Sequence, residues 1–451
     1  MLNKVGDTAS PASSLPVPTV GERLDALPFC RLRLAIFAVV TLALFADIAE
    51  VALGNALGAV FQAPPRTMTP TELSVFLAAI FAGGAIGAPI FGLLGDRVGR
   101  RLALQAALAF VAIGSLAAAA SDSSTSLIGY RFLSGLGIGA CPPLIAAYLA
   151  DIMPPRLRGT MSCLCAGLAF LGAPALILLL RAASPTWIGI EGWRWAVGTG
   201  AVLAALAAAL LSLLPESPRW LAAAGRLAEA ETALSRFGRT ILWKTAGPAP
   251  SAPNARADDE PGTTGRRFVL LCCLYALAPW ATIGFPLMSG AIMVSKQFSI
   301  NESVVAAGLI MFGPVIGNLL VAPLIDRISR KASLIICACA MAVLGLFFAE
   351  ATEFAALVGL GISFALLSAV YASILAIYAA EIIPTRLRAS RTAMAWGMGR
   401  LVSIIVPLIC FAIIRGAGVW GMFALIAAAL GLSAILLAVA GPRGRSRQAL
   451  I

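Results

Sequence analysis

The sequence predicts an all-α membrane protein with twelve transmembrane helices arranged as two six-helix pseudo-repeats. Three observations lead to this fold class: the composition, the number of long apolar segments, and an internal repeat. Of the 451 residues, 60% are hydrophobic and only 12% are charged, whereas soluble domains carry about 25% charged residues. A soluble protein of this size could not cover so much apolar surface, so a helical membrane protein remains.

Apolar segments long enough to cross a bilayer, which takes about 20 residues, recur twelve times. They are 34–61, 73–94, 102–120, 126–149, 161–180, 194–214, 268–291, 303–324, 333–349, 355–380, 392–414 and 419–440. We expect five parts: an N-terminal tail 1–33, a six-helix bundle 34–214, a central loop 215–267, a second six-helix bundle 268–440, and a C-terminal tail 441–451.

The basic residues are distributed unevenly between the two sides of this arrangement. The tails, the central loop and the loops on their side hold 26 of the 33 Lys and Arg residues, and the loops on the other side hold five. Short cytoplasmic loops are enriched in Lys and Arg. We therefore expect an integral protein of the plasma (inner) membrane with both termini and the central loop in the cytoplasm.

Two motifs repeat at the same offset of 230 residues. The first is Asp96-Arg97 followed by Arg100-Arg101, which aligns with Asp326-Arg327 followed by Arg330-Lys331. In the second motif, Asp151 and Arg158 align with Glu381 and Arg388. Two independent matches at one offset indicate duplicated halves, an architecture in which transporters place the substrate site between the halves near the midplane.

From about Leu34 to Ala440 the chain resembles the major facilitator superfamily. The stretch Gly92-x-x-Gly95-Asp96-Arg97-x-Gly99-Arg100-Arg101 matches the superfamily signature between spans 2 and 3. The pattern that starts at Arg131 and continues through glycines 135, 137 and 139 matches span 4. The resemblance implies alternating access by two bundles.

Further motifs are similar to a sugar-porter-like, metabolite:proton symporter branch. Pro215-Glu216-Ser217-Pro218-Arg219-Trp220-Leu221 and the repeated acid-x6-Arg pairs are typical of that branch. The Pro-Glu-Thr-Lys-Gly-like ending of sugar porters is missing, and Asp47-x-x-Glu50 in span 1 resembles aromatic-acid:proton symporters and synaptic-vesicle-glycoprotein-like transporters. The stretch from Trp396 to Pro407 in span 11 also resembles the aromatic-acid symporters. In the span-1 motif, however, Ile48 stands where those symporters usually have Gly.

Four charged residues lie inside predicted spans, namely Asp47, Glu50, Arg131 and Arg400. Inserting each charge into the membrane costs about 2.5–3.5 kcal/mol on insertion scales. Asp47 and Glu50 share one face of span 1 because they are three residues apart. One of them carries a coupled proton, or one merely neutralises Arg131 as a fixed clamp, or the pair binds a cation directly. Since the chain has no histidine, carboxylates are the expected proton carriers.

Arg400 has no acidic partner in the spans of its own half. It contacts a substrate carboxylate, for which a guanidinium offers paired donors, or a structural partner, or it takes part in coupling. Polar and aromatic residues in the spans are candidates to line the substrate site, with packing as the alternative role for each. These candidates are Asn55, Tyr275, Trp280, Asn318, Tyr371, Tyr378 and Trp396.

The repeated loop charges are either topological anchors or an inner gate whose ion pairs form in one conformation and break in the other. The resemblance favours a gate. Its expected members are Asp96, Arg97, Arg100, Arg101, Asp151, Arg158, Asp326, Arg327, Arg330, Glu381 and Arg388.

The sequence excludes several classes of function. Without histidine there is no His-dependent zinc site and no Ser-His or Cys-His nucleophile, and no nucleotide-binding loop is found. We expect no enzyme activity, cofactor, metal or nucleic-acid partner. We expect a monomer in the lipid bilayer that carries a small organic acid together with protons. The alternatives are a drug- or metabolite-exporting antiporter, sugar-type uptake and a non-transporting receptor.

Overall fold

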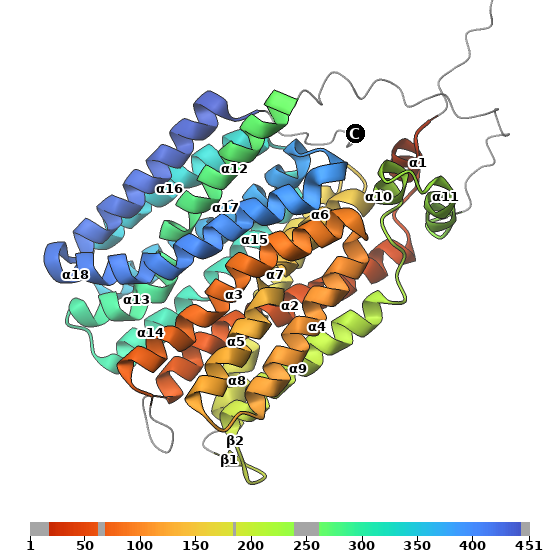
Figure 1. The fold of residues 1–451 in the computed structure, drawn as a ribbon. Coiled ribbons are helices and arrows are strands. Elements are labelled where there is room, and N and C mark those ends of the chain that lie inside the picture. Colours follow the sequence, from red (N-terminus) through yellow and green to blue (C-terminus); the bar gives the residue numbers. More distant parts are fainter. Residues whose placement is uncertain (1–17, 62–67, 184–185, 239–260, 443–451) are drawn as a thin grey trace, which may run out of the picture.

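The computed structural model describes residues 18–61, 68–183, 186–238 and 261–442. Two helical bundles lie side by side, one made by the first half of the chain and one by the second (Figure 1). Eleven of the described helices are long and apolar enough to cross a membrane. The twelfth span is the first arm of the last helix, so the twelve-helix prediction is confirmed.

The first bundle holds six spans, two of which are broken into two helices. They are α2 (Arg31–Val60), α3 (Pro70–Arg97), α4 (Arg100–Ala119), α5 (Ser124–Ile138) with α6 (Cys141–Ile152), α7 (Arg158–Ala169) with α8 (Gly172–Ala183), and α9 (Gly192–Leu211). A two-stranded antiparallel hairpin of β1 (Thr186–Trp187) and β2 (Ile190–Glu191) precedes α9.

The second bundle repeats this plan. It consists of α12 (Pro261–Thr282) with α13 (Gly284–Ser295), α14 (Ile300–Ile310) with α15 (Gly313–Ile325), α16 (Arg330–Glu350), α17 (Phe354–Ile382), a 3-10 turn η2 (Thr385–Leu387), and α18 (Arg388–Ala440).

Helix α18 supplies two spans. Its 53 residues would extend about 80 Å at 1.5 Å per residue, far more than the ~30 Å hydrocarbon core. Gly418 interrupts it with a φ of 70° that glycine adopts without strain, and the helix turns back there at the left of Figure 1. The arms before and after Gly418 correspond to the predicted spans 392–414 and 419–440.

Three short helices cap one end of the first bundle. They are α1 (Val20–Ala26), α10 (Pro218–Ala223) and α11 (Leu227–Ser235), at the upper right of Figure 1. We call this end, which also carries the loops around Gly99, Pro154, Ser329 and Pro384, the basic end of the molecule. The expected tails 1–33 and 441–451 and the loop 215–267 fall partly outside the described residues, and α2 and α12 begin earlier than predicted.

Candidate functional site

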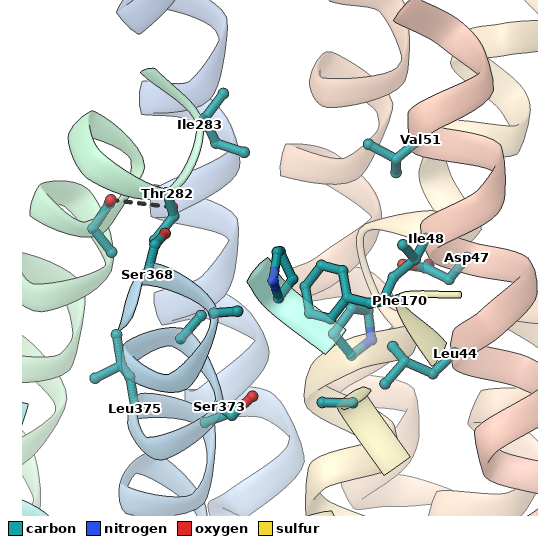
Figure 2. A pocket seen from close by; sticks show the side chains of 18 of the residues that line it. Leu44, Asp47, Ile48, Val51, Phe170, Thr282, Ile283, Ser368, Ser373 and Leu375 are labelled. Atoms are coloured by element: carbon teal, nitrogen blue, oxygen red, sulfur yellow. Dashed lines mark hydrogen bonds between the residues drawn. The ribbon is translucent and has the colours of Figure 1, made fainter. Parts of the chain in front are cut away.

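A cavity of about 360 Å³ lies between the two bundles, a size in the range of small-molecule sites. Residues from α2, α6 and α7 face residues from α12, α17 and α18 across it (Figure 2). Most of the lining is apolar. The polar lining side chains are Asp47, Ser162, Cys165, Tyr275, Thr282, Ser368, Ser373, Trp396, Arg400 and Ser403.

Helix breaks surround this cavity. Spans 4, 5, 7 and 8 are each interrupted, and Pro142, Phe170, Ile283 and Met311, which lie at or next to these interruptions, all line the cavity. Irregular backbone at membrane depth is tolerated where it is buried in protein or faces a cavity. Continuous spans were predicted here, and the prolines at 142, 174, 279, 286 and 314 were the signal that could have located the breaks.

Asp47 from the first half and Arg400 from the second half face the same cavity. Asp47 is 2% exposed and Arg400 9% exposed, and their opposite charges interact across the cavity. Within the described residues neither side chain donates or accepts a hydrogen bond, and Asp47 Oδ1 and Arg400 Nε are buried without a partner. Both polar groups are therefore available to a ligand.

Aromatic rings surround the guanidinium of Arg400. Its Cζ lies 5.0 Å from the ring centre of Trp396 and 5.8 Å from that of Phe81, within the range of cation–π attraction. Tyr275 packs edge-on against Trp396 with ring centres 5.5 Å apart. The indole Nε1 of Trp396 is a further buried donor without a partner among the described residues.

Glu50 has different surroundings from Asp47, although both lie on one face of α2. Arg131 Nη1 donates to Glu50 Oε2 at 2.7 Å and Arg131 Nη2 donates to the Glu50 carbonyl at 3.0 Å, with both side chains buried. Two glycines make room for this pair. A Cβ on Gly200 would lie 2.1 Å from Glu50 Oε1, and one on Gly54 would lie 2.8 Å from Arg131 Nη2.

The predicted lining residues divide into two groups. Tyr275 and Trp396 line the cavity. Trp280, Asn318, Tyr371 and Tyr378 are not among its lining residues, and the side chain of Asn55 lies outside the described part of the chain.

Hydrogen bonds and packing account for the four that lie elsewhere. Tyr371 shares a hydrogen bond of 2.6 Å with Ser433, and Tyr378 donates to the Pro442 carbonyl. Asn318 donates to the Pro314 carbonyl and accepts from Ser373, while Trp280 packs on the core of the second bundle.

At the basic end, Asp96 joins the two halves. It accepts backbone N–H groups of Ala389 at 3.1 Å and Ser390 at 2.8 Å, at the start of α18. The positive end of a helix dipole favours such a carboxylate. Arg100, fully buried, donates to Asp96 at 2.8 Å, to Asp151 at 3.3 Å and to the Thr385 carbonyl of the other half.

Asp326 makes the equivalent contacts in the opposite direction. It accepts N–H groups of Gly159 at 2.9 Å and Thr160 at 2.7 Å, at the start of α7. Arg330 donates to Asp326 at 2.7 Å and to Glu381 at 3.1 Å. The 230-residue repeat in the sequence is therefore also a repeat of contacts.

The remaining repeated pair crosses between the halves. Arg388 forms a buried ion pair with Asp151, and the charge of Arg158 interacts with that of Glu381. The ion pairs and the two helix caps together join the two halves at the basic end.

Three other predicted gate residues lie outside this cross-half network. Arg97 and Arg327 have exposed side chains, and no described contact joins them to the ion pairs. Arg101 donates from Nη1 to the Leu214 carbonyl at 2.8 Å, within the first half.

Glu216, which the sequence analysis noted only as part of a motif, caps α4. It accepts the backbone N–H of Arg101 at 3.1 Å and that of Ser217 at 2.9 Å. Burial raises the pKa of Glu216, and these two N–H bonds partly offset the rise. Gly99 makes the approach possible: its φ is +117°, and a Cβ there would lie 2.2 Å from Glu216 Oε2.

Arg219 connects the network to the short helices. Its Nε donates to the Asp151 carbonyl at 2.9 Å, and its guanidinium forms an ion pair with Asp25 of α1. A Cβ on Gly21 would lie 2.8 Å from Arg219 Nη1. This contact was not predicted, because Asp25 lies nearly 200 residues from Arg219 in a segment interpreted as a tail.

Comparison with known proteins agrees with this architecture. Residues 48–443 match the family described as "Sugar (and other) transporter". The inner membrane metabolite transport protein YdjE of Escherichia coli is 28% identical, over 94% of this chain and 95% of that protein. The arabinose-proton symporter of Bacillus subtilis is also 28% identical, over 76% of this chain and 78% of that protein.

Among solved structures, the proton:xylose symporter XylE, of the major facilitator superfamily, bound to 6-bromo-6-deoxy-D-glucose superposes with a TM-score of 0.77. The match covers 93% of this chain and 98% of that chain at 19% identity, and so supports the fold. The family match covers most of the chain, and both relatives are transporters, not enzymes. The chain belongs to the sugar (and other) transporter family and is a membrane transporter.

Proposed function

We propose that this protein is a secondary active transporter that carries a small organic acid, an aromatic or other carboxylate, together with protons by alternating access. The observation that supports this substrate class is the placement of Asp47 and Arg400 in one largely apolar cavity. The guanidinium of Arg400 has hydrogen-bond donors to offer a carboxylate, and the walls suit the apolar remainder of such a molecule.

Asp47 is the proposed proton carrier. While ionised, it partly neutralises Arg400 across the cavity. Once it is protonated, the positive charge of Arg400 is free to attract an anion, so proton and carboxylate bind better together than alone. This reciprocal coupling of two ligands is what symport requires.

Glu50 and Arg131 are assigned the clamp role, with coupling as their alternative. Both oxygens that Arg131 contacts belong to Glu50, and separating a buried pair leaves an uncompensated charge. In this proposal the pair holds α2 against α5, and its contribution to coupling is indirect.

The ion pairs at the basic end are the proposed inner gate, with Asp96, Arg100, Asp151, Arg158, Asp326, Arg330, Glu381 and Arg388 as its members. Arg97, Arg101 and Arg327 are assigned to membrane topology. The excess of Lys and Arg at this end supports a cytoplasmic location for it and for both termini. The name of the relative YdjE, an inner membrane metabolite transport protein, supports the plasma (inner) membrane as the location of this protein.

Sugar uptake is the second candidate, and the arabinose-proton symporter among the relatives favours it. A sugar needs hydrogen-bond partners for most of its hydroxyl groups. In this cavity Thr282, Ser373 and Ser403 already donate to the Ala278 carbonyl, Asn318 and the Gly399 carbonyl. The largely apolar lining, with the charged donor Arg400 facing it, is why we place a carboxylate first.

The test is a counterflow assay in proteoliposomes with aromatic carboxylates, their neutral amides, and arabinose. The proposal predicts exchange of a carboxylate and weak exchange of its amide. Asp47→Asn should lose accumulation driven by a pH gradient but keep exchange, while Asp122→Asn, an exposed carboxylate, should behave as wild type. Exchange of arabinose without carboxylates would favour the second candidate. Outward drug transport would favour an exporter, and no flux of any compound would favour a receptor.

A further inference from the structure

A second hollow lies outside the transport cavity, where α12 begins and α18 ends. It has a volume of about 800 Å³, and we call it the terminal groove. Its rim is formed by Arg266, Arg267, Gly441 and Pro442, and its walls include Val269 and Leu436. No Asp or Glu is among the described residues that line it.

Donors from the second bundle already occupy three carbonyls at or beside the rim. Lys331 Nζ donates to the carbonyls of Ala438 and Gly441 at 2.9 Å each, and Tyr378 donates to the carbonyl of Pro442 at 2.8 Å. These bonds occupy three carbonyls at the end of α18 that would otherwise repel an anion. Lys331 thereby places a positive charge beside Gly441 on the rim.

Arg266 is the donor with the greatest freedom. Its side chain is exposed, and no described residue forms an ion pair with it. Arg267 is partly engaged, since its Nη1 donates to the Ile382 carbonyl at 3.3 Å. Three more arginines, at positions 443, 445 and 447, follow the rim directly in the sequence.

The walls below the arginines are apolar and face away from the bundle. Val269 is 60% exposed and Cys273 is exposed, and neighbouring α18 residues Ile435 and Val439 are 61% and 83% exposed. On spans 7 and 12 of a membrane protein, such surfaces contact lipid tails. A ligand that fits both parts has an anionic head at the level of the arginines and a hydrocarbon chain below.

We propose that the terminal groove binds an anionic phospholipid. The headgroup phosphate accepts hydrogen bonds from Arg266 and Arg267, and one acyl chain lies along Val269, Cys273 and Leu436. Basic pockets between transmembrane helices near the membrane surface have this chemistry. The site is independent of the transported substrate, because none of its residues lines the transport cavity.

Native mass spectrometry of the purified full-length protein in detergent tests this proposal. Dioleoyl phosphatidylglycerol should bind more tightly than dioleoyl phosphatidylcholine. Arg266→Gln should weaken phosphatidylglycerol binding about fivefold, the effect of one basic residue near a membrane surface. Arg31→Gln is the matched control, because Arg31 is an exposed arginine at the start of the first span of the other half. Phosphatidylglycerol should bind to this variant as tightly as to the wild type.

A thiol-protection assay gives a second measurement that needs no variant. Phosphatidylglycerol should slow maleimide labelling of Cys273 and leave Cys339, an exposed thiol on α16, unaffected. Inorganic phosphate and glycerol 3-phosphate distinguish a free phosphate from a lipid, and neither should protect Cys273. Equal binding of the two lipids, equal losses in the Arg266 and Arg31 variants, or protection by free phosphate would each overturn the proposal.

Discussion

Asp47 and Glu50 lie one turn apart on α2, and their surroundings set different roles. Glu50 has a guanidinium 2.7 Å from one oxygen, so its charge is compensated in place. Asp47 has the opposite charge of Arg400 only across a cavity. A carboxylate that is compensated at a distance can take up a proton, and so release Arg400 to a ligand anion, more readily than one held in a direct ion pair.

The first prediction concerns the buried Glu50–Arg131 pair. Arg131→Met should lower stability by about 3–5 kcal/mol, because Glu50 is then left as an uncompensated buried charge. Adding Glu50→Gln should recover part of the loss. The measurement is the free energy of unfolding of the four proteins of this cycle in detergent. Simple addition of the two single effects would contradict the clamp role.

The second prediction concerns Arg400. Arg400→Lys keeps the charge but loses the planar pair of donors, so carboxylate affinity should fall by about 2–5 kcal/mol, roughly 30- to several-thousand-fold. Binding of the neutral amide analogue should change little. The measurement is a cycle of Arg400→Lys against removal of the ligand carboxylate. If the losses add, Arg400 does not contact the anion.

At the scale of elements, each half caps a helix of the other half. Asp96 binds the first turn of α18, and Asp326 binds the first turn of α7. These caps require small residues at the contact. A Cβ on Gly159 would lie 2.4 Å from Asp326 Oδ1, and one on Gly92 would lie 2.8 Å from the Ala389 carbonyl. The glycines allow the halves to approach closely at the basic end.

The third prediction follows from this close approach. Gly159→Ala should lower stability by about 1–3 kcal/mol, the usual cost of forcing an extra methyl group into a packed contact. Gly198→Ala is the control, because a Cβ there meets no atom within 4 Å and alanine favours the helix. The midpoint of thermal unfolding in detergent should therefore be lower for Gly159→Ala than for Gly198→Ala. Equal midpoints would show that the α7 cap tolerates displacement of Asp326.

Among the helices, the number of spans was predictable from the sequence, but the breaks within them were not. The spans and their number followed from composition, because the bilayer fixes the length of an apolar helix. The breaks after Ile138, Ala169, Thr282 and Ile310 could not be located in that way, since an apolar run stays apolar across a break. Helix α1 was missed for another reason: its contact with Arg219 depends on residues distant in sequence.

At the scale of the whole molecule, the repeat in the sequence did not indicate which charges pair with each other. The sequence placed Asp151 and Arg158 in one motif and Glu381 and Arg388 in its copy. In the fold Asp151 pairs with Arg388 instead, because the two halves face each other at the basic end. Which acid of α2 holds Arg131, and that Arg400 faces Asp47, were equally beyond a single sequence, since both depend on how helices rotate about their axes.

The contacts between the halves at the basic end, our proposed inner gate, give the last prediction. Arg388→Gln removes a cross-half ion pair with Asp151, while Arg100 and Ser217 keep that carboxylate hydrogen-bonded. The halves should then separate more often at this end, which exposes the transport cavity to the side we assign to the cytoplasm. Labelling of Cys165, a buried thiol that lines the cavity, should become faster when a membrane-impermeant maleimide is added from that side.

The control for this experiment is Arg386→Gln. Arg386 is exposed and lies two residues from Arg388, so its loss changes the net charge equally without breaking a cross-half pair. Its labelling rate should match that of the wild type. If both variants label Cys165 at the wild-type rate, the pair does not limit opening, and the helix caps made by Asp96 and Asp326 must keep the basic end closed without it.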